Sequence, residues 1–319
     1  MTIAIETTRG SLRLQGIWLP LVTPFRDGRI DDAGLLALVR HYVDQPIDGL
    51  ILAATTGEAL TLSPDEVARV VYGAAEAAAG QIPLCLGICG SDTRKLVETI
   101  ERRNGWPVDA YLVTCPYYSR PSQEGLRRHF AAAAEVSAKP IVLYNIPYRT
   151  GVNLSVETTL RLAALDAIVG IKDCCADVTQ SFELLRARPP GFSVMTGEDA
   201  QFFPAIAQGA DGGILASAHV ETEAFAEIHA ALAAGDRQTA LARWTDLAEI
   251  VRLLFAEPSP APIKYWLWRE GLIASPEVRL PMTEISEGLA ARINRVMEQR
   301  ARPRPLRAMA PATVADLSR

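Results

Sequence analysis

Lys172 is the residue whose type and position first suggest chemistry in this chain. Arginine carries most of the positive charge, with 28 copies, and the only lysines are Lys95, Lys139, Lys172 and Lys264. Unlike arginine, a lysine can lose its proton near neutral pH. Lys172 ends the apolar run 168–171, and a desolvated amine there would attack a ketone and form an imine, which is an electron sink. The alternative is a strand-end lysine that reaches solvent or pairs with Asp173.

An amine nucleophile also needs groups that move protons. Tyr144 ends the apolar run before that of Lys172, and a phenol both donates and accepts a proton. Thr55 and either Tyr117 or Tyr118 could extend such a relay through their hydroxyls. Taken singly, each aromatic residue could equally well plug the top of a barrel. The relay is therefore a hypothesis about residues that the fold has to bring together.

A 2-oxo acid would also need its carboxylate held. Thr56 and the Gly57 backbone lie where a turn enters a helix, and such turns present free N–H groups to anions. Arg149 could hold a second carboxylate, because its planar guanidinium binds one bidentately. A plain surface charge is an equal alternative for Arg149.

Other kinds of catalysis find little support. A metal-dependent aldolase is disfavoured, and we expect no metal, because no HxH or HxxE spacing joins the histidines His41, His129, His219 and His229. No GxSxG elbow and no Ser-His-Asp arrangement is evident. Small buried hydrophobic residues, rather than reactive thiols, are the favoured interpretation of Cys89, Cys115, Cys174 and Cys175.

The elements that must position these residues form a regular pattern. Short apolar runs alternate with longer amphipathic stretches, as in parallel strands covered by helices. The runs are 14–22, 47–54, 83–88, 108–114, 140–144, 168–172, 192–196 and 211–216. Eight such units predict an α/β fold, a (β/α)8 TIM barrel, whose active site lies at the carboxyl ends of the strands. A doubly wound sheet is the competing interpretation, but no Gly-rich phosphate turn follows the first run.

More helix follows the eighth strand than a barrel needs. Further helical patterns cover 221–234, 237–255, 262–270 and 287–299. We therefore predict a barrel over 1–235, a small C-terminal helical extension over 236–300, and a loosely ordered tail over 301–319.

Composition narrows the possible partners and the location. The net charge of −5 makes nucleic acid an improbable partner, because a phosphate backbone needs a basic surface. No apolar stretch approaches 18 residues, so we expect no membrane helix. The N-terminus shows no secretory pattern, and the five cysteines have no ligand spacing. These features favour the cytoplasm.

Several motifs together resemble a known family. In order along 16–283, the chain carries TTGE at 55–58, PYYSRPSQEGL at 116–126, YNIPYRTG at 144–151, GIKD at 170–173, GED at 197–199, EPSPAPIK at 257–264 and LPMT at 280–283. On these motifs it resembles the dihydrodipicolinate synthase / N-acetylneuraminate lyase family, and more closely its synthase branch.

The resemblance implies roles for individual residues. Lys172 matches the lysine that forms the imine, Tyr144 the phenol beside it, and Thr55 the threonine of the proton relay. Tyr118 matches a tyrosine that completes the relay from a neighbouring subunit. Thr56 matches the threonine that binds the carboxylate of the 2-oxo acid.

Further matches concern the two substrate pockets. Gly197 and Ile214 match positions that line the pyruvate pocket. Arg149 matches the arginine that binds the carboxylate of the aldehyde in the synthase branch. Lyase and sugar-acid aldolase branches usually carry another residue there, so Arg149 favours the synthase branch.

The resemblance implies a Schiff-base lyase that condenses pyruvate with L-aspartate 4-semialdehyde to 4-hydroxy-tetrahydrodipicolinate, a step toward lysine, with no cofactor. It further implies a homo-oligomer: a dimer with a shared site, assembled into a dimer of dimers. One alternative is a paralogous pyruvate-dependent aldolase or dehydratase acting on a 2-keto-3-deoxy sugar acid or a hydroxy-oxo acid. Another is a non-catalytic barrel that binds a 2-oxo acid.

The chain departs from the synthase pattern in places. GIKE has become GIKD, followed by Cys174 and Cys175, and EPNP has become EPSP. Pro64, Val67 and Ser91 stand where lysine-inhibited members carry histidine and asparagine, although Tyr117 remains. We therefore expect weak or absent inhibition by lysine.

Overall fold

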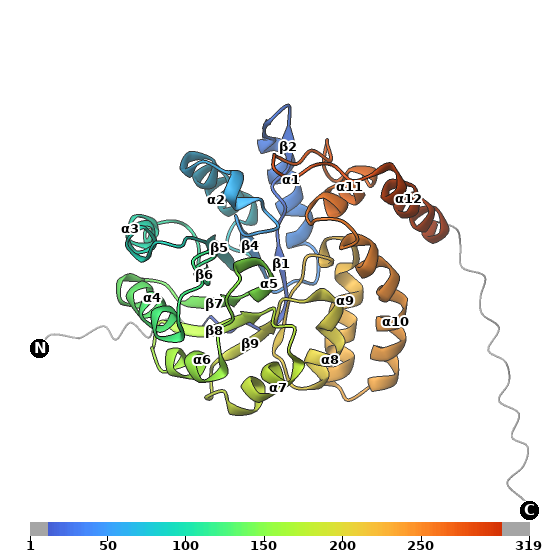
Figure 1. Ribbon diagram of the computed structural model, residues 1–319. Coiled ribbons are helices and arrows are strands. Elements are labelled where there is room, and N and C mark those ends of the chain that lie inside the picture. Colours follow the sequence, from blue (N-terminus) through green and yellow to red (C-terminus); the bar gives the residue numbers. More distant parts are fainter. Residues whose placement is uncertain (1–11, 302–319) are drawn as a thin grey trace, which may run out of the picture.

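The computed structural model describes residues 12–301. Eight parallel strands close into a barrel in the order β1-β10-β9-β8-β7-β6-β5-β4, with helices around the outside (Figure 1). The strands are β1 (Gly16–Pro20), β4 (Gly49–Leu52), β5 (Leu84–Ile88), β6 (Ala110–Thr114), β7 (Ile141–Asn145), β8 (Ile168–Asp173), β9 (Ser193–Thr196) and β10 (Gly212–Ile214). The predicted TIM barrel is confirmed, and each predicted apolar run overlaps one strand, although β7 and β8 each end one residue beyond their runs.

Helices follow the strands and cover the barrel. They are α1 (Asp32–Val43), α2 (Pro64–Ala78), α3 (Thr93–Arg103), α4 (Gln123–Val136), α5 (Pro147–Thr150), α6 (Val156–Ala163), α7 (Val178–Ala187), α8 (Phe202–Ala207) and α9 (Ala218–Ala233), with 3-10 turns η1 (Ala59–Thr61) and η2 (Asp199–Gln201). Helix α2 begins as predicted: Ser63 and Glu66 form a reciprocal capping box, and Pro64 fills the first helical position.

Alternation along the strands sorts the core into two layers. On β6, Ala110 and Leu112 face the barrel interior, whereas Tyr111 and Val113 face the surrounding helices. The same period of two on β8 puts Ile171 outside, so Lys172 points inward. The barrel interior is thus filled with side chains, and polar groups among them are shielded from water.

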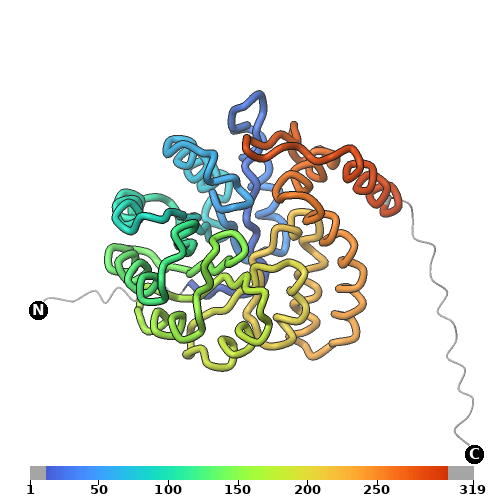
Figure 2. The backbone as a smooth tube through the Cα atoms, in the orientation of Figure 1, coloured from blue at the N-terminus to red at the C-terminus, as the bar shows by residue number. Residues whose placement is uncertain are grey.

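The C-terminal extension consists of α10 (Arg237–Leu254), α11 (Ala261–Arg269) and α12 (Glu287–Ala301). Helix α10 packs against α9, and the segment between α11 and α12 runs beside the loop at residues 27–28 (Figure 2). The domain division at residue 235 stays a prediction, and residues 302–319 of the predicted tail lie outside the described part of the chain. No helix among the described residues is long and apolar enough to cross a membrane.

One element was not predicted. Strands β2 (Phe25–Arg26) and β3 (Arg29–Ile30) form a small antiparallel hairpin before α1. Asp27 and Gly28, its two turn residues, both have positive φ, as a tight hairpin turn requires. The strands are too short to show an alternating pattern, although the Asp-Gly pair was a signal for the turn.

Closure of the barrel depends on two glycines. Gly212 of β10 pairs with Gly16 of β1, and a Cβ at residue 212 would lie 2.1 Å from the Gly16 carbonyl oxygen. No side chain larger than a hydrogen atom fits at this contact. Strand β10 can therefore pair with β1 only if residue 212 is glycine.

We expect Gly212→Ala to lower the free energy of unfolding by about 1–3 kcal/mol, since an added methyl group has to push two strands apart. Gly105→Ala is the matched control, because a Cβ there meets nothing within 4 Å. Urea unfolding of both variants measures the effect. Equal stability of the two variants would contradict the role of this contact in closure.

Candidate active site

Lys172 and Tyr144 lie side by side in the barrel. They are register partners on β8 and β7, and the Lys172 Nζ sits 4.5 Å from the centre of the Tyr144 ring. Lys172 is only 6% exposed and Tyr144 only 3%. The structure thus places the predicted amine and phenol together at the carboxyl end of the barrel.

Burial changes the ionisation of both groups. Desolvation lowers the pKa of Lys172, and the nearby Glu198 and Asp199 only partly oppose this effect. Desolvation raises the pKa of Tyr144, while a hydrogen bond with Thr55 acts in the opposite direction. Burial therefore favours a neutral amine, which can attack a carbonyl, beside a neutral phenol, which can donate a proton.

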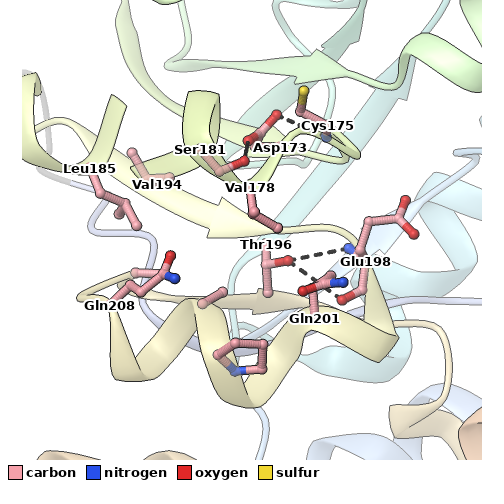
Figure 3. A pocket seen from close by; sticks show the side chains of 13 residues that line it. Asp173, Cys175, Val178, Ser181, Leu185, Val194, Thr196, Glu198, Gln201 and Gln208 are labelled. Carbon is pink, nitrogen blue, oxygen red and sulfur yellow. Dashed lines mark hydrogen bonds between the residues drawn. The ribbon is translucent and has the colours of Figure 1, made fainter. Parts of the chain in front are cut away.

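Asp173 does not pair with Lys172. Its side chain lies on the outer side of β8, where it accepts hydrogen bonds from Ser181 at 2.6 Å and from the Cys175 amide at 3.1 Å (Figure 3). A small cavity of about 50 Å³ between β9 and the helices α7 and α8 is lined by this group. The salt-bridge alternative for Lys172 is therefore wrong, because successive strand residues point to opposite faces.

The turn after β4 carries the remaining small hydroxyls. Thr55 is exposed toward the barrel mouth, and Thr56 is buried. Among the described residues, the N–H groups of Thr56 and Gly57 have no acceptor, whereas the N–H of Glu58 returns to the Thr55 carbonyl. Two free amides beside two hydroxyls suit a carboxylate, as the sequence predicted.

A cavity of about 310 Å³ opens at the barrel mouth. Thr55, Tyr117 and Arg149 line it, together with residues of the C-terminal extension. Arg149 lies against the Tyr148 ring, with its Cζ 5.6 Å from the ring centre, and hydrogen-bonds the Tyr148 hydroxyl. This volume is in the range of small-molecule sites.

Gly197 and Ile214, the positions predicted to line the pyruvate pocket, lie close to Lys172 and Tyr144. A Cβ at residue 197 would lie 2.3 Å from the Cys174 Sγ and 2.5 Å from the Lys172 Cε. Only glycine therefore leaves the lysine chain its space. Ile214 is 1% exposed and belongs to the same apolar cluster as Tyr144 and Cys174.

Tyr118 is not brought to the other site residues. Its side chain is 94% exposed, and its backbone has a φ of 71°, which a non-glycine residue seldom adopts. The N–H of Tyr118 donates to the Thr150 carbonyl at 3.1 Å, so the backbone that carries this ring is held in place. Of the two tyrosines predicted as alternatives for the relay, Tyr117 lines the cavity with Thr55, whereas Tyr118 extends into solvent.

Sequence reasoning missed Glu198 as a neighbour of the amine. Its carboxyl lies close to the Cys174 thiol and the Tyr148 hydroxyl, and its Oε1 is buried without a hydrogen-bond partner among the described residues. Desolvation raises the pKa of Glu198. The motif at 197–199 was the available signal, but nothing in it showed that this acid turns toward Lys172. Cys115 and Cys174 are buried, as expected for small hydrophobic residues, but the same prediction is wrong for Cys89, which is exposed, and Cys175 is only partly buried.

No group of three or more His, Cys, Asp or Glu side chains within residues 12–301 is arranged to hold a metal ion.

Comparisons with known proteins agree with each other. The model of the dihydrodipicolinate synthetase family matches residues 13–300. The chain is 43% identical over 286 residues to 4-hydroxy-tetrahydrodipicolinate synthase 2 of Clostridium acetobutylicum, covering 90% of this chain and 100% of that protein. Dihydrodipicolinate synthase from Aquifex aeolicus has a TM-score of 0.87 and 33% identity, covering 90% and 98% of the two chains.

A third relative was solved with a substrate. The chloride-inhibited dihydrodipicolinate synthase from Acinetobacter baumannii, complexed with pyruvate, has a TM-score of 0.86 and 35% identity. The match covers 90% of this chain and 99% of that one. The likeness thus extends over the barrel and the C-terminal extension.

Because the Lys172 amine is buried, we expect the protein to become more stable when this amine is removed. We expect Lys172→Met to raise the free energy of unfolding at neutral pH, because methionine needs no solvation in the barrel. The folded pKa of Lys172 lies below its ordinary value of 10.5, so the wild-type protein gains stability as pH rises between the two. The advantage of Lys172→Met therefore shrinks at alkaline pH.

Denaturant unfolding at neutral and alkaline pH measures this difference. Lys95→Met is the matched control, because Lys95 is exposed. If Lys172→Met raised the free energy of unfolding equally at both pH values, or by no more than Lys95→Met does, Lys172 would not be desolvated.

Proposed function

The chain belongs to the dihydrodipicolinate synthetase family, and we propose that it condenses pyruvate with L-aspartate 4-semialdehyde to 4-hydroxy-tetrahydrodipicolinate. The observation that carries this proposal is the desolvated Lys172 amine packed beside the Tyr144 phenol. The relatives named as synthases support the second substrate.

The first half of the reaction takes place on Lys172. Its neutral Nζ adds to the C2 carbonyl of pyruvate, and the carbinolamine loses water to give an imine. Tyr144 and the neighbouring Thr55 hydroxyl carry the protons that this step moves. Thr56 and the Gly57 amide hold the pyruvate carboxylate beside the turn.

The second half takes place at the cavity mouth. Loss of a proton from C3 converts the imine to an enamine, which attacks the aldehyde carbon of the second substrate. Arg149 holds the carboxylate of that substrate from the cavity wall. The substrate amine then adds to the imine carbon, closes the ring and releases Lys172. The imine itself is the electron sink, so this scheme uses no metal or organic cofactor.

A second subunit completes the site in this proposal. Tyr118 projects from its own chain and is available to a neighbouring copy. We propose a dimer in which each Tyr118 extends the relay of the other subunit, assembled into a tetramer as a dimer of dimers. A related synthase variant has been characterised as monomeric, so assembly differs among relatives.

The remaining expectations are secondary to the reaction. The sugar-acid aldolase and the non-catalytic barrel are disfavoured by the relatives and by Arg149 in the cavity wall. A cytoplasmic location fits the five free thiols. Weak or absent lysine inhibition stays a prediction.

We expect Arg149→Ala to lower kcat/KM for aspartate semialdehyde by about 10- to 100-fold, since a charge-assisted hydrogen-bond pair to the carboxylate is lost. Trapping of pyruvate on Lys172 by borohydride should stay within about 3-fold of wild type, since Arg149 acts after imine formation. Arg94→Ala, which removes an exposed arginine, is the control. An unchanged rate with aspartate semialdehyde would refute this role, and activity on sugar acids alone would refute the proposed reaction.

Sharing of the site predicts complementation between two inactive variants. In a mixed dimer of Tyr118→Ala and Lys172→Ala, one site keeps both an intact lysine and an intact tyrosine. Random mixing of the subunits should therefore restore about a quarter of the wild-type activity. The assay is turnover before and after the two purified variants are dissociated and reassembled together. No recovery in verified mixed dimers would place the whole relay within one chain.

A further inference from the structure

Glu58 joins three separate parts of the chain at the edge of the cavity. It follows the Thr55–Gly57 turn directly and is 5% exposed. Its Oε1 accepts a hydrogen bond from Lys264 Nζ at 2.5 Å, and its Oε2 accepts one from the backbone N–H of Arg279 at 2.9 Å. Lys264 lies on α11 and is fully buried, whereas Arg279 belongs to the segment between α11 and α12.

Each of these three parts supplies one wall of the cavity. The turn supplies Thr55, the start of α11 supplies Ser259 and Pro260, and the following segment supplies Pro281 and Met282. The two oxygens of one carboxylate therefore determine where the anion-binding turn lies relative to the opposite wall.

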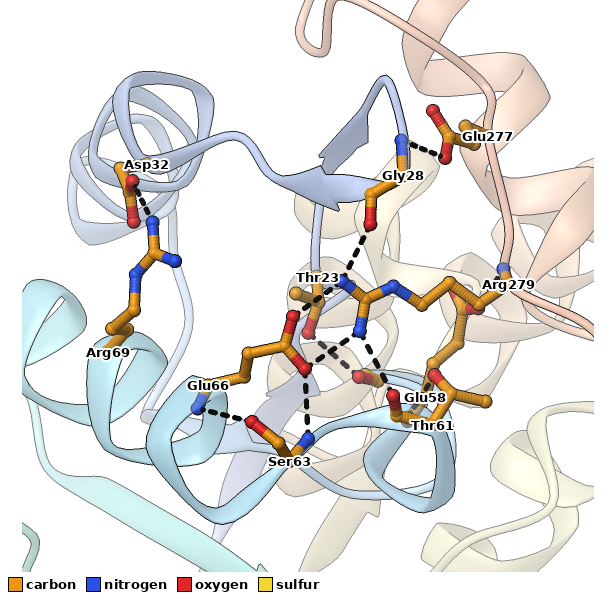
Figure 4. Close-up of polar contacts among 11 residues, drawn as sticks. Thr23, Gly28, Asp32, Glu58, Thr61, Ser63, Glu66, Arg69, Glu277 and Arg279 are labelled. Atoms are coloured by element: carbon orange, nitrogen blue, oxygen red, sulfur yellow. Dashed lines mark hydrogen bonds and ion pairs between the residues drawn. The ribbon is translucent and has the colours of Figure 1, made fainter.

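The Arg279 side chain fixes the segment further. Its two terminal nitrogens bind the Glu66 carboxylate at 2.8 and 2.6 Å and also reach the carbonyls of Thr61 and Gly28 (Figure 4). Lys264 donates to the Glu277 carbonyl at 2.7 Å. We call Glu58, Lys264, Arg279 and Glu66 the Glu58 clasp.

Stability alone gives a weak reason for such a clasp. Desolvating two charges offsets most of their attraction, so an apolar pair of similar size is often at least as stable. What an apolar pair cannot do is fix directions, because hydrogen bonds to two oxygens specify where each partner lies. Small displacements at a reacting site slow the reaction, and a shift of about 1 Å can lower the rate by up to about 100-fold.

We propose that Glu58 is a positioning residue, which holds the Thr55–Gly57 turn and the Pro281–Met282 wall at the separation that the reaction requires. Both of its carboxylate oxygens are occupied by Lys264 and the Arg279 N–H, so the residue acts through Thr55, Thr56 and the segment bonded to its Oε2. The inference rests on the proposed function, because its effect appears in the rates of the two half-reactions.

Glu58→Gln tests the proposal with almost no change in shape. Glutamine replaces one of the two carboxylate oxygens with an NH2 group, so either the Lys264 ammonium or the Arg279 N–H then faces another donor. The single variant also leaves the Lys264 ammonium buried without a counter-charge, and it should therefore unfold at a lower temperature. We expect kcat/KM for pyruvate, and the rate of borohydride trapping on Lys172, to fall by about 10- to 100-fold.

The double variant Glu58→Met/Lys264→Met separates position from stability. Methionine at both positions removes the buried charges, so the melting temperature should return toward that of wild type. The rates should remain low, because no side chain then accepts from the Arg279 N–H or donates to the Glu277 carbonyl. Arg188→Met/Asp211→Asn is the matched control, since this ion pair lies at the amino-terminal ends of the strands, away from the cavity.

Recovery of the rates together with the melting temperature would show that the Glu58 clasp is only structural, and would overturn the proposal. So would wild-type rates in the single variant, or an equal loss of rate in the control. If the single variant fails to fold, the rates and the melting temperature of the double variant, each compared with wild type, test the proposal. Absence of aspartate semialdehyde turnover in the wild-type protein would instead refute the proposed function, and pyruvate trapping would still report on Glu58.

Discussion

The whole site depends on keeping one amine away from water. Lys172 reacts only as a neutral group, and at neutral pH water would keep it protonated. The barrel interior solves this by filling the space around the lysine with apolar side chains such as Met195 and Ile214. The acids Glu198 and Asp199 act in the opposite direction and raise the pKa of the amine. Burial outweighs them, so the barrel core favours the neutral amine that the proposed reaction needs.

The register of the strands then determines which side chains share the barrel interior with Lys172. Parallel strands place Tyr144 and Lys172 at the same level, because both are the inward residue near the carboxyl end of their strand. One residue further along β8, Asp173 faces the helices and bonds Ser181 instead. Shifting β8 by a single residue would exchange an amine for a carboxylate at the imine position. Gly197 completes the arrangement by leaving the lysine chain room on the side of β9.

Much of this arrangement could be predicted from the sequence, because it follows from local patterns. Apolar runs located all eight barrel strands, and the capping signals around Ser63 located a helix start. The predicted Lys172–Tyr144 pairing needed only strand order and a period of two. Contacts between distant segments left no such trace: Glu58 and Lys264 are 206 positions apart. The direction of Glu198 and the outward Tyr118 ring also depend on turn conformations that residue types alone do not specify.

The C-terminal extension has to be counted as part of the site rather than as an addition to the barrel. In many barrels the loops after the strands build the entire mouth. Here residues 259–260 and 281–282 line the cavity, and they come from after the barrel's last strand. Burial of the Lys264 side chain lowers its pKa to about 8, in keeping with a contact that is removed from water. Because Glu58 and Lys264 join the turn after β4 to α11, the cavity has both of these walls only when the extension is packed against the barrel.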